Sequence, residues 1–180
     1  MELLKNVFFW TNIATATIVL EFVVFISRRK YKRIVYILSG ISALIFFEIP
    51  RLIIPLLPQP SIGLNLNIAK ILGGLIFLSG LFIIGVAFFQ IMEAKKESWK
   101  LRTSGIYGVV RHPMYLGDIL WALGWSIIFN AFYGLILTFL WIFLRYSLAI
   151  LEEEKLIEKY GETYKNYMQK VPKRLIPYLI

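Results

Sequence analysis

Long apolar runs, separated by short polar segments, dominate the pattern of hydrophobic and polar positions along the chain. A helix needs ~20 residues to cross ~30 Å of hydrocarbon, because each residue adds ~1.5 Å along the helix axis. The runs that reach or approach this length are residues 7–27, 34–57, 68–92, 113–129 and 131–150. Asn130 alone separates the last two, so they are expected to form a tight helical hairpin. The pattern predicts an all-α integral membrane protein with about five transmembrane helices.

The composition supports this prediction. The chain has 180 residues, 58% of them hydrophobic, and its mean hydropathy is +0.69. A soluble domain of this length has a less apolar composition. No internal repeat or long linker divides the chain, so residues 1–180 are expected to form a single membrane domain. With no cysteine and one histidine, the sequence predicts no thiolate or histidine-rich metal site.

The basic residues predict the orientation in the membrane. Most of the 20 Lys and Arg residues follow the first, third or fifth predicted span, whereas residues 58–67, between the second and third, carry no charge. The positive-inside rule then predicts that the N-terminus lies outside and the C-terminus in the cytosol. The basic residues are dispersed over three juxtamembrane segments without a recognition motif. Contacts with membrane lipids are therefore expected, and a nucleic acid partner is not.

A polar segment leads into the fourth span and carries an arginine, a histidine and two tyrosines. It reads SGIYGVVRHPMYLG over residues 104–117. Pro113 suits the first turn of a helix, and the free N–H groups of that turn attract a carboxylate or a phosphate. Arg111 and His112 would strengthen this attraction, or they would anchor the helix among lipid headgroups. The segment is therefore a candidate site for a polar cofactor at the cytosolic end of the helices.

An acidic and amphipathic segment follows the fifth span. Glu152, Glu153 and Glu154 precede apolar residues that keep helical spacing as far as Val171. This pattern predicts an amphipathic helix over residues 152–170 on the cytosolic face. Carboxylates near a helix N-terminus are favourable with the helix dipole, which is a structural reason for them. A functional alternative is that they hold ribose hydroxyls or face a cationic centre.

Charged residues within the predicted spans need partners, because an isolated charge in hydrocarbon is costly. Glu48 and Arg51 are three residues apart and are expected to pair with each other. Asp118 lies ~7 Å along the helix from Pro113, and it is expected either to line a polar cavity or to sit at the interface. Glu21 has no evident partner in the sequence.

Two stretches resemble the signatures of one enzyme family. LRTSGIYGVVRHPMYLG, residues 101–117, resembles the TSGxY and RHPxYxG segments of the isoprenylcysteine carboxyl methyltransferase family and its phospholipid methyltransferase relatives. EEEKLIEKYGETYKNYMQKVPKRLIP, residues 152–177, resembles the same family's second signature, an EExxL helix with two tyrosines and a closing RxxP. Both stretches lie in the family's order on the predicted cytosolic side. The first three spans resemble generic apolar helices.

The resemblance implies methyl transfer from S-adenosylmethionine by an enzyme embedded in the bilayer. The implied cofactor-binding residues are Tyr107, Arg111, His112, Pro113, Tyr115, Leu116, Gly117, Glu152 and Glu153. The family has an arginine shortly before its glutamate pair, where this chain has Leu148 and Ala149. Arg145, about one helical turn earlier, is expected to replace it as the catalytic residue that faces the acceptor.

The resemblance also implies a lipophilic or prenylated acceptor that enters from the bilayer. An isoprenylcysteine-type carboxylate is the first candidate and needs no general base. A phospholipid amine is the alternative, and Glu153 is then the candidate catalytic base. Residues 159–177 also resemble the C-terminal end of membrane sterol reductases, which use NADPH, although three adjacent glutamates disfavour a dinucleotide phosphate. A transporter or scaffold is disfavoured because the polar residues gather at one cytosolic end.

Overall fold

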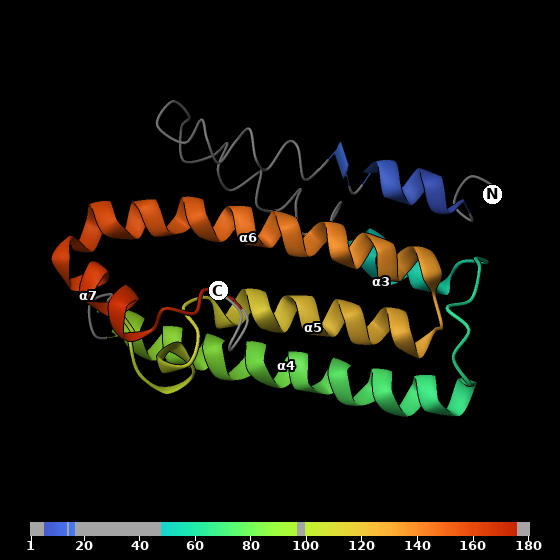
Figure 1. Ribbon diagram of the computed structural model, residues 1–180, viewed down its shortest axis with the longest axis horizontal. Helices are drawn as coiled ribbons and strands as arrows, with labels where there is room; N and C mark the ends of the chain where they lie inside the picture. Colours follow the sequence, from blue (N-terminus) through green and yellow to red (C-terminus); the bar gives the residue numbers. More distant parts are fainter. Residues whose placement is uncertain (1–5, 14, 17–47, 97–99, 176–180) are drawn as a thin grey trace.

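The computed structural model is built from helices and describes residues 6–13, 15–16, 48–96 and 100–175 (Figure 1). The helices are α3 (Ile49–Ile53), η3 (Ile54–Leu56), α4 (Leu66–Lys96), η4 (Gly105–Gly108), α5 (Pro113–Ile128), α6 (Phe132–Tyr160) and α7 (Glu162–Lys170). Residues 7–13 are helical as well. The predicted all-α class is confirmed for the described residues.

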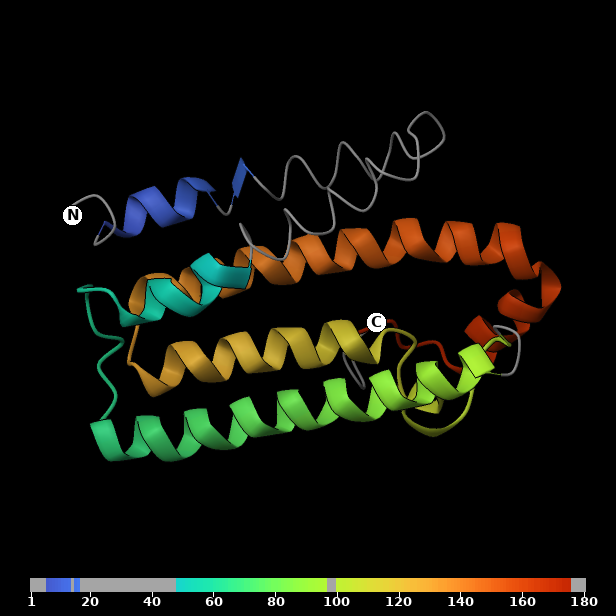
Figure 2. The same ribbon diagram turned by 180° about the vertical axis from the view of Figure 1, so that it is seen from behind.

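The three long helices lie side by side, with α5 between α4 and α6 in both views (Figures 1 and 2). The predicted spans over 68–92, 113–129 and 131–150 overlap with α4, α5 and the first part of α6. The predicted spans over 7–27 and 34–57 fall largely outside the described residues, as does Glu21. The predicted number of five spans therefore stays a prediction.

Glycines bring the backbones of α4 and α5 into contact. Gly73 and Gly80 on α4 face Gly124 and Gly117 on α5, and each pair of glycines on one helix is seven residues apart. A Cβ added at Gly73 would lie 2.8 Å from the carbonyl oxygen of Gly124, and one added at Gly117 would lie 2.8 Å from that of Gly80. Helices can approach this closely only where no side chain stands between them. The pairing fixes the position of α5 against α4.

A tight turn at Asn130 joins α5 to α6. Asn130 adopts a left-handed backbone conformation with φ 54°, which asparagine tolerates better than most residues. Its side-chain amide donates to the carbonyl of Leu64 at 2.7 Å, and its own carbonyl accepts from the amide of Ile62 at 3.1 Å. The turn therefore also holds the connection between η3 and α4.

The end of α6 differs from the predicted boundary near residue 151. The helix continues through Glu152, Glu153 and Glu154 to Tyr160 and stops at Gly161, which has φ 55°. Glutamate, leucine and lysine favour helix, so the change from apolar to polar sequence does not end it. The segment predicted as one helix over 152–170 is thus the last part of α6 followed by α7.

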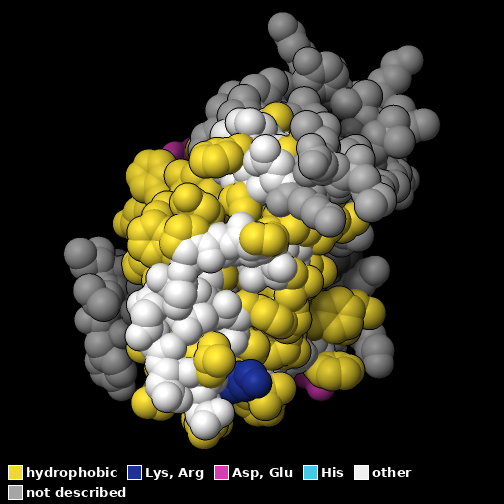
Figure 3. Space-filling model, turned by 90° about the vertical axis from the view of Figure 1, so that its right-hand side faces the viewer, with side chains coloured by type: hydrophobic (Ala, Val, Ile, Leu, Met, Phe, Trp, Pro, Cys, Tyr) yellow, Lys and Arg dark blue, Asp and Glu magenta, His cyan; other side chains and the backbone are white. Residues whose placement is uncertain are grey.

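Among the described residues, two helices are long and apolar enough to cross a membrane, namely Leu66–Ala94 and Phe132–Tyr160. Large hydrophobic side chains on them are exposed, including Ile71, Phe82 and Phe89 on α4 and Phe139 and Phe143 on α6. Figure 3 views the end of the bundle that carries the 57–65 connection, and hydrophobic side chains predominate there. The exposed apolar side chains along α4 and α6 suit contact with lipid.

The glycine contact between α4 and α5 leads to a stability prediction. Replacing Gly124 with Ala should lower the free energy of unfolding by about 1–3 kcal/mol, because the added Cβ meets the backbone of Gly73 and Phe77. Gly74→Ala is the matched control, since nothing lies within 4 Å of its added Cβ. That control should be neutral or stabilising by up to about 1 kcal/mol. Thermal unfolding in detergent micelles measures both, and equal melting temperatures would contradict the packing.

Candidate functional site

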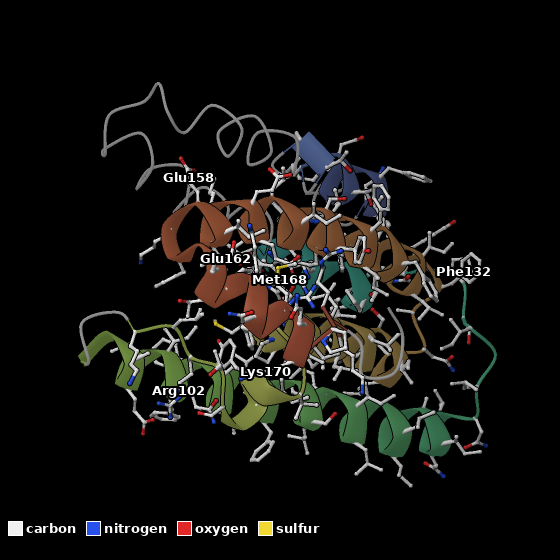
Figure 4. The ribbon with its side chains drawn as sticks, turned by 60° about the vertical axis from the view of Figure 1, so that its left-hand side comes forward. Arg102, Phe132, Glu158, Glu162, Met168 and Lys170 are labelled. Carbon is white, nitrogen blue, oxygen red and sulfur yellow. The ribbon has the colours of Figure 1, made fainter. Side chains whose placement is uncertain are left out.

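A cavity of about 810 Å³ lies at the end of the bundle where α6 meets α7. Its wall is built by α4, α5, α6, α7, Glu48 and the segment from Lys100 to His112. Figure 4 shows α7, with Glu162, Met168 and Lys170, between the ends of α6 and α4, and Arg102 near the end of α4. The cavity reaches from this end to Asp118 and Trp121, one to two helical turns inside α5.

Most residues predicted for the site lie in the cavity wall. These are Tyr107, Arg111, His112, Pro113, Tyr115, Arg145 and Glu152. Leu116, Gly117 and Glu153 are not in the wall. Gly117 faces Gly80 and Ile84 of α4, so it serves the packing of α5. The functional roles of all these residues stay predictions.

Glu153 is the centre of a buried ion-pair cluster. Its side chain is 3% exposed. Arg111 Nε donates to Glu153 Oε1 at 2.7 Å, and His112 Nε2 lies 3.2 Å from the same oxygen. Arg174 donates to Oε2 through Nε at 3.0 Å and through Nη2 at 2.8 Å. The carboxylate is thus surrounded by three basic side chains, which disfavours a role as proton acceptor.

The segment after α7 pairs with the segment before α5. The amides of Arg111 and His112 donate to the carbonyls of Lys173 and Arg174 at 2.9 and 3.0 Å. Arg111 Nη1 also donates to the carbonyl of Val171 at 2.7 Å. Arg174 is not predicted as a site residue from the sequence, although it is the arginine of the closing RxxP in the second signature. Its place beside Glu153 follows only from this chain pairing.

His112 stands between two carboxylates. Its ring stacks on Tyr115 with centroids 5.5 Å apart, and Tyr115 donates its hydroxyl to Glu152 at 2.9 Å. His112 Nδ1 lies 3.5 Å from Glu152 Oε2, on the opposite side of the ring from Glu153. Burial lowers the pKa of His112, but its hydrogen bonds to Glu152 and Glu153 outweigh burial, and the pKa is raised above 6.5. His112 therefore keeps its positive charge to a higher pH than a free histidine.

Tyrosines form the part of the wall that α7 covers. Tyr164 and Tyr167 of α7 are buried and pack edge to face with centroids 5.6 Å apart. The hydroxyl of Tyr167 donates to the carbonyl of Tyr107 at 2.7 Å. Burial raises the pKa of all three tyrosines above their ordinary range, so they stay neutral. This end of the cavity offers an aromatic surface on which a planar ring can pack.

The deep end of the cavity carries a second cluster of four charges. Arg51 Nη1 contacts Glu48 Oε1 at 3.0 Å, which confirms the predicted pair, and also donates to Asp118 Oδ1 at 2.8 Å. Arg145 Nε donates to Asp118 Oδ2 at 2.6 Å, and its Nη2 lies 3.5 Å from Glu48 Oε1. Asp118 therefore lines a polar cavity, one of its two predicted locations.

The sequence model described as phospholipid methyltransferase matches residues 67–163. The chain belongs to the phospholipid methyltransferase family. The predicted family resemblance is confirmed by this match. The matched residues of this family domain include α4, α5, α6 and most of the cavity wall, whereas Glu48, Arg51 and Arg174 lie outside them.

The similar proteins are named either as methyltransferases or as sterol reductases. The chain is 35% identical over 103 residues to the protein-S-isoprenylcysteine O-methyltransferase of Schizosaccharomyces pombe. These aligned residues are 56% of this chain and 44% of that protein. The chain is 33% identical over 143 residues to the enzyme of the same name from Xenopus laevis, covering 76% and 49%. It is 37% identical over 86 residues to the Delta(14)-sterol reductase of Mus musculus, covering 44% and 20%. The chain thus spans half or less of the length of these relatives. No solved structure is significantly similar to it.

The geometry of His112 predicts its titration. Because its pKa is raised, its contribution to the free energy of unfolding is complete below about 6.5 and is lost as the pH rises through the folded-state value. Glu152→Gln should lower the pKa of His112, since it removes a negative charge beside Nδ1. As the one histidine of the chain, His112 can be followed by NMR without assignment overlap. Glu162→Gln, on the exposed surface of α7, is the control, and a wild-type pKa at or below 6.5 would contradict the geometry.

Proposed function

We propose that the chain transfers a methyl group from S-adenosylmethionine to a lipophilic acceptor in the membrane. The observation that supports this most is a single cavity with a polar and aromatic end under α7 and a charged end deep between the helices. Its volume of about 810 Å³ is in the range that takes a cofactor together with part of a second ligand. A cofactor at one end and an acceptor head at the other would meet inside the protein.

The residues at the α7 end have the chemistry that S-adenosylmethionine requires. Its carboxylate suits Arg102 and the positive charge of His112, whose two ring nitrogens already face Glu152 and Glu153. Its ribose hydroxyls and ammonium suit Glu152, and its adenine suits Tyr107 and the other tyrosines. When bound, this cofactor supplies an electrophilic methyl group on a positively charged sulfur. Arg111 and Pro113 complete the wall of this end. Gly117 and Glu153 would act by holding the start of α5 in place.

The chain's own contribution to the reaction would be alignment and exclusion of water. Arg145 and Glu152 are seven residues apart on α6, about two turns or ~10 Å, and both are in the cavity wall. The same helix therefore presents one residue to the acceptor end and the other to the cofactor end. The tyrosines of α7 cover the cofactor end.

Two acceptor classes have separate support. The names of the methyltransferase relatives favour an isoprenylcysteine-type carboxylate, which would contact Arg145. The family name favours a phospholipid amine, and so does the presence of Glu48 and Asp118 beside Arg145. The ion pairs of Glu153 leave Glu48 as the more accessible candidate for accepting a proton from an amine.

An NADPH-dependent reductase is the competing function, because sterol reductases are among the relatives. Glu152 in the cavity wall would repel the phosphates of a dinucleotide. In the methyltransferase proposal, the Glu152 carboxylate instead attracts the positively charged S-adenosylmethionine.

We also propose that residues 1–180 form one membrane domain with five spans, the N-terminus outside and the site on the cytosolic side. The length of α4 and α6 supports this arrangement, as does the uncharged connection over residues 58–65 at the end of the bundle opposite the cavity. Most basic residues of the described part of the chain lie toward the cavity end, whereas Lys70 lies near the start of α4 at the other end.

Cofactor binding tests the proposal directly. Isothermal titration of the purified protein should show binding of S-adenosylmethionine and S-adenosylhomocysteine and none of NADPH. His112→Ala should weaken binding of S-adenosylmethionine by about ten- to hundredfold, because the cavity wall loses a positive charge and Glu152 loses its charged partner. Glu162→Gln should leave the affinity unchanged. Binding of NADPH in place of S-adenosylmethionine would instead support the reductase.

Cysteine labelling tests the orientation. The chain has no cysteine, and Ser61 and Ser104 are exposed at opposite ends of α4. Ser104→Cys should react with a membrane-impermeant maleimide only from the cytosolic side, and Ser61→Cys only from the other. Labelling of both from one side would contradict the proposed arrangement.

A further inference from the structure

The charge cluster at the deep end of the cavity combines two carboxylates with two guanidinium groups. Glu48, Asp118 and Arg145 are in the cavity wall, and Arg51 lies behind them with its side chain 0% exposed. Arg51 is held between Trp121 and Trp141, whose ring centroids are 4.6 and 4.9 Å from its guanidinium carbon. The cluster has no net charge, because Glu48 and Asp118 balance the two arginines. An incoming head group therefore meets no excess positive charge.

The members of the cluster differ in how far they open to the cavity. The side chain of Glu48 is 31% exposed, compared with 17% for Arg145 and 13% for Asp118. Both oxygens of Asp118 have donors, Arg51 and Trp121 on Oδ1 and Arg145 on Oδ2. Both oxygens of Glu48 accept from Arg51 Nη1 at 3.0 Å, so the two carboxylates differ in exposure and not in having donors. Glu48 is therefore the carboxylate that a ligand can reach.

The contact between Glu48 and Arg145 is the long one of the cluster. Their closest distance is 3.5 Å, compared with 2.6 Å between Arg145 and Asp118 and 3.0 Å between Arg51 and Glu48. A carboxylate ligand that approached Arg145 would have to replace this contact. It would still face Glu48, which Arg51 keeps in position, and two carboxylates at this distance repel each other strongly where little water screens them.

We propose that Glu48 selects the methyl acceptor by charge, so that the deep end of the cavity favours an amine head group and opposes a carboxylate. This inference rests on the proposed methyltransferase function and adds a specificity-determining residue to it. Glu48 precedes α3 and lies outside the residues that the family model matches. Acceptor choice is then set by a part of the chain that the matched domain does not contain.

The movement of charge during the reaction also favours an amine acceptor. An ammonium head group first loses a proton to a Glu48 oxygen, and the nitrogen then attacks. A bond forms between nitrogen and the methyl carbon, the bond between that carbon and the donor sulfur breaks, and the sulfur leaves as a neutral thioether. The positive charge passes to the nitrogen, where a nearby carboxylate stabilises it. A carboxylate acceptor ends as a neutral ester and gains nothing from Glu48.

A competition assay tests this proposal with the full chain in phosphatidylcholine vesicles and a labelled methyl donor. The amine probe is phosphatidylethanolamine added to the vesicles, and the carboxylate probe is an N-acetylated prenylcysteine. Glu48→Gln should lower kcat/KM for the amine about tenfold or more and raise it for the carboxylate. Glu48→Asp should retain the wild-type preference, and Glu162→Gln should change neither value. Affinity for S-adenosylmethionine should stay within about twofold in every variant.

The outcomes are distinguishable. An unchanged ratio of the two kcat/KM values in Glu48→Gln, with normal binding of S-adenosylmethionine, would overturn the role of Glu48 and leave the methyltransferase proposal intact. Loss of S-adenosylmethionine binding in both Glu48 variants would also overturn it, because the residue would then serve the fold. A wild-type chain that binds no S-adenosylmethionine would overturn the proposed function itself.

Discussion

The buried carboxylate of Glu153 is the interaction on which the site depends. A charge with 3% exposure is tolerated only with partners, and here the partners come from two distant segments, Arg111 and His112 before α5 and Arg174 after α7. Removing Glu153 would leave the buried guanidinium of Arg111, 5% exposed, without its carboxylate. The cluster therefore fastens the start of α5 and the C-terminal segment to α6, and the cavity wall is assembled as a consequence.

Close packing of α4 on α5 complements this cluster. Glycines let the two backbones touch and so fix the position of α5 along α4. This position brings Asp118 within hydrogen-bond distance of Arg145 on α6 and Arg51 on α3. The deep cluster then joins three parts of the chain through ion pairs, of which those of Asp118 are the most buried. One face of α6 supplies both ends of the cavity, since Arg145 and Glu152 are two turns apart.

Some of the site could be predicted from local sequence. The helix start at Pro113 and the pairing of Glu48 with Arg51 depend on residues within one helical turn, and both are present. Glu153 was predicted as a cofactor ligand or base, yet the structure surrounds it with basic side chains outside the cavity wall. The predicted end of the fifth span lies near residue 151, where the sequence changes from apolar to polar. The helix itself continues to Tyr160 and stops at Gly161.

The sequence by itself determined the helical class, the apolar lengths of α4 and α6 and the two signatures, because each of these is a property of neighbouring residues. The tertiary structure decided which charges meet. Arg111 and Glu153 are 42 residues apart and Arg51 and Asp118 are 67 apart, so no local pattern relates them. Only the packing of the helices brings these side chains within hydrogen-bond distance, and the strong cost of leaving a buried charge unpaired then fixes the contacts.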